Sequence, residues 1–182
     1  ALGTAAGITT EILNVGTKPV GGCIGCGGCA KGNGCVFGGV VNEAIEKART
    51  ADAFVFGTPV HYASASGNMT SFLDRLAYAG GKYLAYKPAA ICCSARRAGT
   101  TATLDQLAKY PEFFHMPLVS GSYWPMVHGS NPEQVLQDEE GCAVMKELGR
   151  NMAWLLQCIA AGRAAGVPEP IQEERAWTNF IR

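Results

Sequence analysis

The spacing of apolar and polar residues differs from one segment of this chain to the next. Short apolar runs at 53–56, 88–93 and 116–120 predict buried strands of a parallel sheet. Residues 8–15 alternate apolar and polar side chains, which predicts an edge strand with one solvated face.

Other segments repeat their apolar residues every three or four positions, which predicts helices. They are 40–51, 66–77, a segment capped by Thr100 or Thr101 that runs through Ala108, and a long region opening at Asn131-Pro132. Pro168 and Pro170 end the last of these helices. Trp154 lies within it, and we expect its side chain in the core.

Strands that alternate with helices predict an α/β fold with a mainly parallel sheet and helices on both faces. In such folds ligands bind at the carboxyl ends of the strands. The loops to search for a site are therefore 16–39, 57–66 and 94–101.

The charge balance argues against nucleic-acid and membrane partners. The 182 residues include 15 Lys and Arg and 15 Asp and Glu, so the formal net charge is zero and no long-range field attracts a polyanion. No apolar stretch reaches the roughly 18 residues of a membrane span. With 48% apolar and 16% charged residues, the composition is that of a compact domain. We expect a cytoplasmic enzyme.

The eight cysteines fall into two groups. Four lie within thirteen residues of a glycine-rich loop, and the rest lie in apolar runs, namely Cys92, Cys93, Cys142 and Cys158. This distribution indicates one metal or redox loop and a set of buried thiols in a reducing compartment.

Several motifs together resemble the NADPH-dependent FMN reductase family. Gly57-Thr-Pro-Val-His-Tyr-Ala-Ser-Ala-Ser-Gly67, with the helix at Met69–Arg75, is similar to the family's second flavin loop. Ser94-Ala-Arg-Arg-Ala-Gly-Thr-Thr101 is similar to its third flavin loop, and Cys23, Cys26, Cys29 and Cys35 are similar to its cysteine loop. Further similarity over 123–129, 149–156 and 178–182 extends the resemblance over nearly the whole chain.

The resemblance implies a flavodoxin-like fold, a doubly wound parallel sheet in three α/β/α layers. Members of the family begin with a strand, a loop that cradles the FMN phosphate, and a helix. Residues 1–4 resemble the end of that helix, so we expect the first strand and the phosphate site to lie upstream of Ala1. One FMN-binding domain is expected over 1–167, with a tail, 168–182, that packs on a partner subunit.

The resemblance also implies that FMN contacts two loops. The cofactor-binding residues would be Thr58, Pro59, Val60, His61, Tyr62, Ala63, Ser64, Ser94, Arg96, Arg97, Gly99 and Thr100. Small side chains let the main chain approach the flavin ring, whose N and O atoms can accept backbone N–H bonds. His61 or Tyr62 would stack on the ring or border it, and one arginine would face the flavin or a nicotinamide dinucleotide. The alternatives are an ordinary turn and a solvated arginine pair.

The spacing of Cys23, Cys26, Cys29 and Cys35 is similar to the motif of iron–sulfur flavoproteins, which pair FMN with a [4Fe–4S] cluster. Glycines between the thiols would let the backbone wrap a cluster. An unmetallated loop, a zinc site and a redox disulfide remain alternatives.

The leading hypothesis is an FMN-dependent oxidoreductase that passes electrons from NAD(P)H to a quinone, a flavin or a similar acceptor. Flavin carries this chemistry, so no catalytic acid, base or nucleophile of the protein is expected. An alternative is an iron–sulfur electron carrier supplied by ferredoxin, and another is a flavodoxin-like interaction domain without cofactor. We expect a homo-oligomer, either a dimer or a tetramer.

Overall fold

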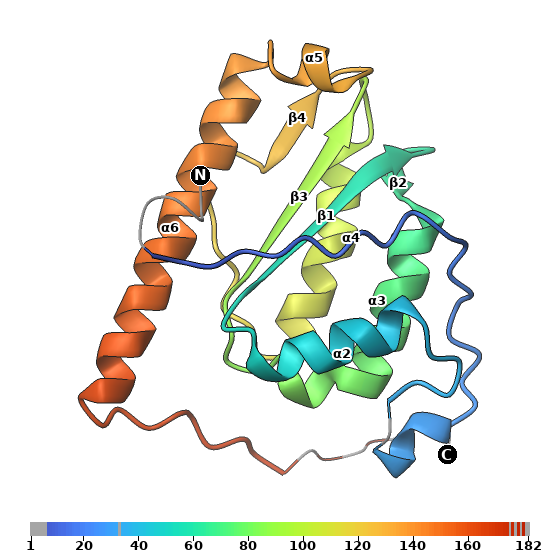
Figure 1. Cartoon of the computed structure of the whole chain (residues 1–182), viewed down its shortest axis with the longest axis vertical. Coiled ribbons are helices and arrows are strands. Elements are labelled where there is room, and N and C mark those ends of the chain that lie inside the picture. The colour runs from blue at the N-terminus through green and yellow to red at the C-terminus, as the bar shows by residue number, and fades with distance from the viewer. Residues whose placement is uncertain (1–6, 33, 175, 177, 179, 181–182) are drawn as a thin grey trace.

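The computed structural model describes residues 7–32, 34–174, 176, 178 and 180. In this part of the chain the sheet has the strand order β2-β1-β3-β4 (Figure 1). The strands are β1 (Phe54–His61), β2 (Ser64–Ala65), β3 (Ala89–Ala95) and β4 (Met126–His128). Strands β1, β3 and β4 are parallel, and β2 forms an antiparallel hairpin with β1. The carboxyl ends of the three parallel strands therefore share one edge.

The predicted helices are present and alternate with the strands. They are α2 (Val40–Thr50), α3 (Gly67–Gly80), α4 (Thr100–Phe113), α5 (Pro132–Val135) and α6 (Glu139–Ala164), with short 3-10 turns η1 (Gly28–Lys31) and η2 (Gly81–Tyr83). Ser66 caps α3 as expected, because its side chain accepts a bond from Met69 N. Neither Thr100 nor Thr101 caps α4, contrary to the prediction. The N-cap is Gly99, whose φ of 102° needs a residue without Cβ.

Side chains of β3 point alternately into two packed layers, so helices cover both faces of the sheet. Ala89, Ile91 and Cys93 belong to a core shared with α2, α3 and α4. Ala90 belongs to a second core with Leu148 and Met152 of α6. This arrangement confirms the expected three-layer α/β architecture.

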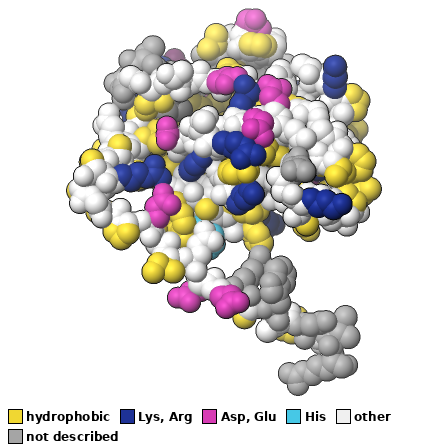
Figure 2. Space-filling model, turned by 60° about the horizontal axis from the view of Figure 1, so that its bottom comes forward, with side chains coloured by type: hydrophobic (Ala, Val, Ile, Leu, Met, Phe, Trp, Pro, Cys, Tyr) yellow, Lys and Arg dark blue, Asp and Glu magenta, His cyan; other side chains and the backbone are white. Residues whose placement is uncertain are grey.

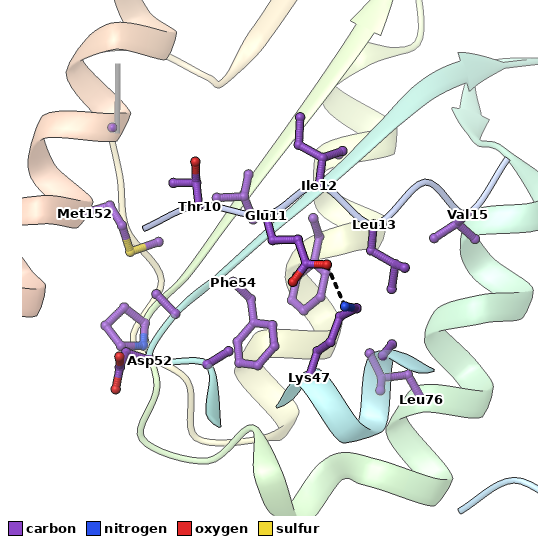
Figure 3. Close-up of a pocket in the computed structure, with 18 of the residues that line it drawn as sticks. Thr10, Glu11, Ile12, Leu13, Val15, Lys47, Asp52, Phe54, Leu76 and Met152 are labelled. Carbon is purple, nitrogen blue, oxygen red and sulfur yellow. Dashed lines mark hydrogen bonds and ion pairs between the residues drawn. The ribbon is translucent and has the colours of Figure 1, made fainter. Parts of the chain in front are cut away.

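Residues 8–15 are not a strand, contrary to the prediction. They run as an extended segment across the sheet in Figure 1, and among the described residues they form no strand ladder. Alternation favours an extended chain, but a strand also needs a partner for its N–H and C=O groups. Instead the segment is tied down by an ion pair between Glu11 and Lys47 of α2 (Figure 3).

The strand predicted at 116–120 is reduced to a single bridge between Ala89 and Leu118. Pro117 has no N–H to donate, and the chain leaves β3 after Val119 donates to Ala89 O. It returns to the same edge of β3 as β4, which pairs Cys93 with Met126. The predicted position of this strand is therefore wrong, because the strand that pairs with β3 here is β4, which lies further along the chain.

Two predictions of burial on α6 are also wrong. Trp154 is 66% exposed, and the thiol of Cys158 is exposed as well. The buried stripe of α6 runs through Val144, Leu148 and Met152, and both residues lie off it. Helical spacing identified the buried stripe, but an apolar residue elsewhere on the same helix need not be buried.

The outer surface mixes charges of both signs. Figure 2 shows Lys and Arg side chains interspersed with Asp and Glu on one face. No helix in the described residues has the length and apolar character to span a bilayer.

Candidate functional site

The two predicted flavin loops lie next to each other at the carboxyl edge of the sheet. Pro59 of β1 pairs with Ser94 of β3, so both strands run out into their loops at the same level. Beyond them Gly99 packs directly on Ala63. A Cβ at Gly99 would lie 2.4 Å from Ala63 Cα, so only glycine permits this approach.

The tip of the first loop is a strained turn. Tyr62 and Ala63 have φ values of 50° and 59°. These lie in the left-handed region, which costs each residue other than glycine roughly 1–2 kcal/mol. Gln106 of α4 holds the turn, because its Oε1 accepts bonds from Ser64 Oγ at 2.7 Å and Ala65 N at 3.2 Å. The ring of Tyr62 is fully exposed. Strain kept in place by such contacts is typical of ligand-binding loops.

Two hydroxyls of the first loop are engaged within the protein. Thr58 Oγ1 is buried, accepts a bond from Ser66 N at 3.2 Å and lies 3.1 Å from Ser66 Oγ. Ser64 Oγ donates to Gln106. The buried hydroxyl of Thr58 leaves only its backbone for a ligand, whereas Pro59 and His61 are exposed at the edge.

The second loop offers positive charge beside the first. Arg96 and Arg97 are exposed, and neither forms an ion pair with any residue in the described part of the chain. Behind them Gly99 opens α4, whose first N–H groups carry the positive end of the helix dipole. Thr100 is buried, so its contribution is through its backbone. Ser94 is half-buried at the end of β3.

His128 lies at the same edge, because it pairs with Ala95 in the sheet. Asp138 Oδ2 accepts a bond from His128 N at 2.7 Å and lies 3.7 Å from His128 Nδ1. Bonds from the backbone N–H groups of Gly141 and His128 lower the pKa of Asp138 below its ordinary value. Its carboxylate therefore stays ionised and holds His128 at the edge.

An open groove of about 1860 Å³ lies beside this edge, between α6, β1 and residues 7–16 (Figure 3). Its lining includes 57–59, His61 and 66–69, but not the second flavin loop. Val55, on the groove face of β1, is 49% exposed. The groove thus extends from the first flavin loop along the open side of β1.

The four cysteines of the loop do not converge, contrary to the prediction. No three His, Cys, Asp or Glu side chains of the described residues form a group that could hold a metal ion. The reason lies in how the loop is attached. Cys23 and Cys26 are exposed, Cys29 lies in η1, and Cys35 is tied to the helices behind it.

Sequence reasoning missed the residues that hold these loops in place. Gln106 anchors the turn at the tip of the first loop, and Asp138 caps α6 and binds the backbone of His128. Arg75 is 7% exposed and donates to the cysteine loop. An acidic residue directly before Glu139-Glu140 could have identified Asp138 as an N-cap. The pattern of apolar residues carries no signal for Gln106 or Arg75.

The residues present fit FMN at the carboxyl edge. The backbone of 58–64 lies at an exposed edge, and the start of α4 at Gly99 adjoins it. Two arginines lie beside this edge, and neither forms an ion pair within the described residues. Such an edge suits a flat ring with an anionic tail. The four thiols of the cysteine loop are of the type that ligates an iron–sulfur cluster, but among the described residues they form no group that could hold one.

Comparisons with known proteins find related sequences. An iron–sulfur flavoprotein of Methanocaldococcus jannaschii is 26% identical over 162 residues, which cover 84% of this chain and 83% of the relative. An iron–sulfur flavoprotein of Archaeoglobus fulgidus is 28% identical over 145 residues, covering 78% of this chain and 72% of the relative.

Among solved structures, the Trp repressor binding protein from Bacillus subtilis matches with a TM-score of 0.51 and 17% identity. The match covers 59% of this chain and 74% of the other, and it supports the fold alone. The fold is flavodoxin-like, as expected. The family model described as NADPH-dependent FMN reductase matches residues 1–131. This chain therefore belongs to the NADPH-dependent FMN reductase family.

Proposed function

We propose that this chain uses FMN to pass electrons from NAD(P)H to a small acceptor such as a quinone or a free flavin. Family membership makes it a flavin-dependent oxidoreductase. The observation that supports the cofactor site is the close packing of Gly99 on Ala63, which joins the two flavin loops at the carboxyl edge.

The main chain of 58–64 and residues 94–100 would hold the flavin. When bound, FMN supplies the chemistry by accepting a hydride and releasing electrons to the second substrate. The protein contributes a preorganised edge: Gln106 fixes the turn, so that its N–H groups need not reorganise when the ring binds. One of the two arginines, Arg96 or Arg97, would face the flavin or attract the phosphates of the dinucleotide.

A second candidate function is electron transfer from ferredoxin through a [4Fe–4S] cluster. It is favoured by the four thiols of the cysteine loop and by the two relatives, both of which carry the name iron–sulfur flavoprotein. Cys23, Cys26, Cys29 and Cys35 would be the ligands. Binding would require the exposed part of the loop to close on Cys35.

Rapid-mixing experiments on the full-length protein separate the two functions. The bound flavin is mixed anaerobically with NADPH, with NADH or with reduced ferredoxin, and its visible absorption is followed. We expect fast bleaching by a nicotinamide. Reduction by ferredoxin alone would contradict the first function and support the second. No reduction by any donor would favour an interaction domain.

We also propose that the protein is a homo-oligomer. The exposed rings of Tyr123, Trp124 and Trp154 are the surface that favours this. The expected packing of the tail on a partner subunit is part of the same proposal, although Trp177 lies outside the described residues.

A further inference from the structure

The hairpin between β1 and β2 turns through two residues that do not suit its geometry. His61 pairs with Ser64, so the turn consists of Tyr62 and Ala63. Their φ values are 50° and 59°. Two-residue turns with both φ angles positive favour asparagine, aspartate and glycine, because larger side chains strain left-handed backbone. This turn therefore lowers the stability of the fold.

The strain at Tyr62 is not offset by a contact of its ring. In the described part of the chain four residues other than glycine have a positive φ, and the other three pack against a neighbour. Ala63 lies against Gly99, and Tyr86 stacks on His115 with ring centroids 5.9 Å apart. The ring of Tyr62 is fully exposed, and its hydroxyl has no hydrogen-bond partner among the described residues. Backbone strain without a return in stability points to a function for the residue.

The turn cannot relax without disturbing the edge of the sheet. Gln106 Oε1 accepts a bond at 2.7 Å from Ser64 Oγ, directly after the turn. The main chain of Ala63 also packs on Gly99 of the second loop. These contacts hold the backbone of Tyr62 in place and leave its ring in solvent, outside the junction of the two loops.

The surroundings of the ring indicate what it can bind. A tyrosine ring has an electron-rich face, which stacks well on a flat, electron-poor ring. The exposed Arg96 and Arg97 belong to the second loop, which adjoins the turn through Gly99. Guanidinium groups favour a ligand with negative charge or carbonyl oxygens. A quinone has both the flat, electron-poor ring and the carbonyl oxygens.

We propose that Tyr62 is the specificity-determining residue for the electron acceptor, and that its ring is the surface on which a quinone stacks. The strained turn is kept because it presents this ring outside the junction of the loops, where a second substrate arrives when the flavin is in place. This inference rests on the first proposed function, in which the main chain of 58–64 holds FMN.

The test compares Tyr62→Gly and Tyr62→Phe with His115→Gly. His115 has a φ of 56° and follows the far end of α4, so its replacement relieves the same kind of strain away from the carboxyl edge. The full chain is saturated with FMN, and binding of anthraquinone-2-sulfonate is measured by equilibrium dialysis without an electron donor. Urea unfolding of the protein without ligands and FMN fluorescence titration are measured separately.

We expect Tyr62→Gly to lower the equilibrium constant for unfolding roughly 2–10-fold, because relief of the strain exceeds the added entropy of glycine in the unfolded chain. The same variant should raise the dissociation constant of the quinone roughly 2–12-fold through loss of the stacked ring. Tyr62→Phe keeps the ring and should bind the quinone like the wild type. His115→Gly should gain stability in the same way and bind the quinone like the wild type. The FMN dissociation constant of Tyr62→Gly should stay that of the wild type, because the main chain of the turn is kept.

Unchanged quinone affinity in Tyr62→Gly overturns the inference, whether or not the stability of the variant rises. A variant that loses affinity for FMN and keeps its affinity for the quinone also overturns it, because the ring would then serve the flavin. A wild-type protein that binds FMN but no anthraquinone-2-sulfonate overturns it as well. Bleaching of the bound flavin by NADPH tests the proposed function separately, since the dialysis uses no electron donor. Failure of bleaching with quinone binding intact contradicts the NAD(P)H-linked function and leaves the role of Tyr62 in quinone binding supported.

Discussion

Gly99→Ala is the substitution that probes the junction of the two flavin loops. The φ of Gly99 is +102°, and an added Cβ would lie 2.4 Å from Ala63 Cα and 2.9 Å from Val60 Cγ1. Forcing a side chain into left-handed backbone costs about 1–2 kcal/mol, and overpacking costs about 1–3 kcal/mol more. Because Ala63 Cα belongs to the main chain, no side-chain rotation relieves the contact. We therefore expect a loss of about 2–5 kcal/mol in the free energy of unfolding, part of which is relieved if the loops separate.

Separation of the loops should also weaken flavin binding. Losing one well-placed N–H donor costs about 1–3 kcal/mol, which corresponds to roughly a 5- to 150-fold increase in the FMN dissociation constant. Urea unfolding and FMN fluorescence titration measure the two effects. Gly162→Ala, within α6, is the matched control, because an added Cβ there would meet only Val167, at 3.9 Å. The free energy of unfolding of this variant should stay equal or rise by up to about 1 kcal/mol. If Gly99→Ala unfolds and binds FMN like the wild type, the two loops do not form one site.

Three further predictions concern single contacts. Gln106→Leu removes the acceptor for Ser64 and Ala65, so it should lower stability by about 1–3 kcal/mol in urea unfolding and weaken FMN binding; unchanged values would show that the turn is held otherwise. Asp138→Ala removes the cap of α6 and should cost about 0.5–2 kcal/mol at neutral pH. Because the folded pKa of Asp138 is depressed, its contribution is present above the unfolded carboxyl pKa of about 3.9 and is lost as pH falls through the folded value, so melts of the two proteins should converge in acid. A gap that widens in acid would refute this. Burial raises the pKa of the Cys93 thiol to about 11, so iodoacetamide at neutral pH should leave Cys93 unmodified in the native protein while it labels exposed Cys158, as peptide mass spectrometry would show; equal labelling of the two would contradict the structure.

The sequence predicted those parts of the fold that local patterning controls. The apolar stripes gave α2, α3 and α6, and the apolar runs at 53–56 and 88–93 gave the central strands β1 and β3. Where the outcome depends on a partner far along the chain, the pattern failed. Residues 8–15 alternate correctly but lack a ladder, and 116–120 forms only the Ala89–Leu118 bridge before pairing beside β3 resumes at β4.

The candidate site was predictable from the sequence to about the same extent as the fold. Motif order singled out the two loops that we propose bind flavin, and parallel pairing of β1 with β3 explains why they meet. The inward turn of the Thr58 hydroxyl, the anchoring by Gln106 and the burial of Arg75 arise from tertiary contacts between residues far apart in the sequence. No local pattern encodes such contacts. The separated cysteines show the same limit, since spacing fixes which thiols are near in sequence and not where the helices hold them.

The central claim is that this protein binds FMN and cycles it between NAD(P)H and an acceptor. The most direct measurement is the visible spectrum of the full-length protein, purified anaerobically, supplied with FMN and then titrated with NADPH or NADH. We predict equimolar bound FMN whose absorption bleaches on addition of the nicotinamide and returns when a quinone is added. A colourless protein that gains no flavin from added FMN would contradict the claim.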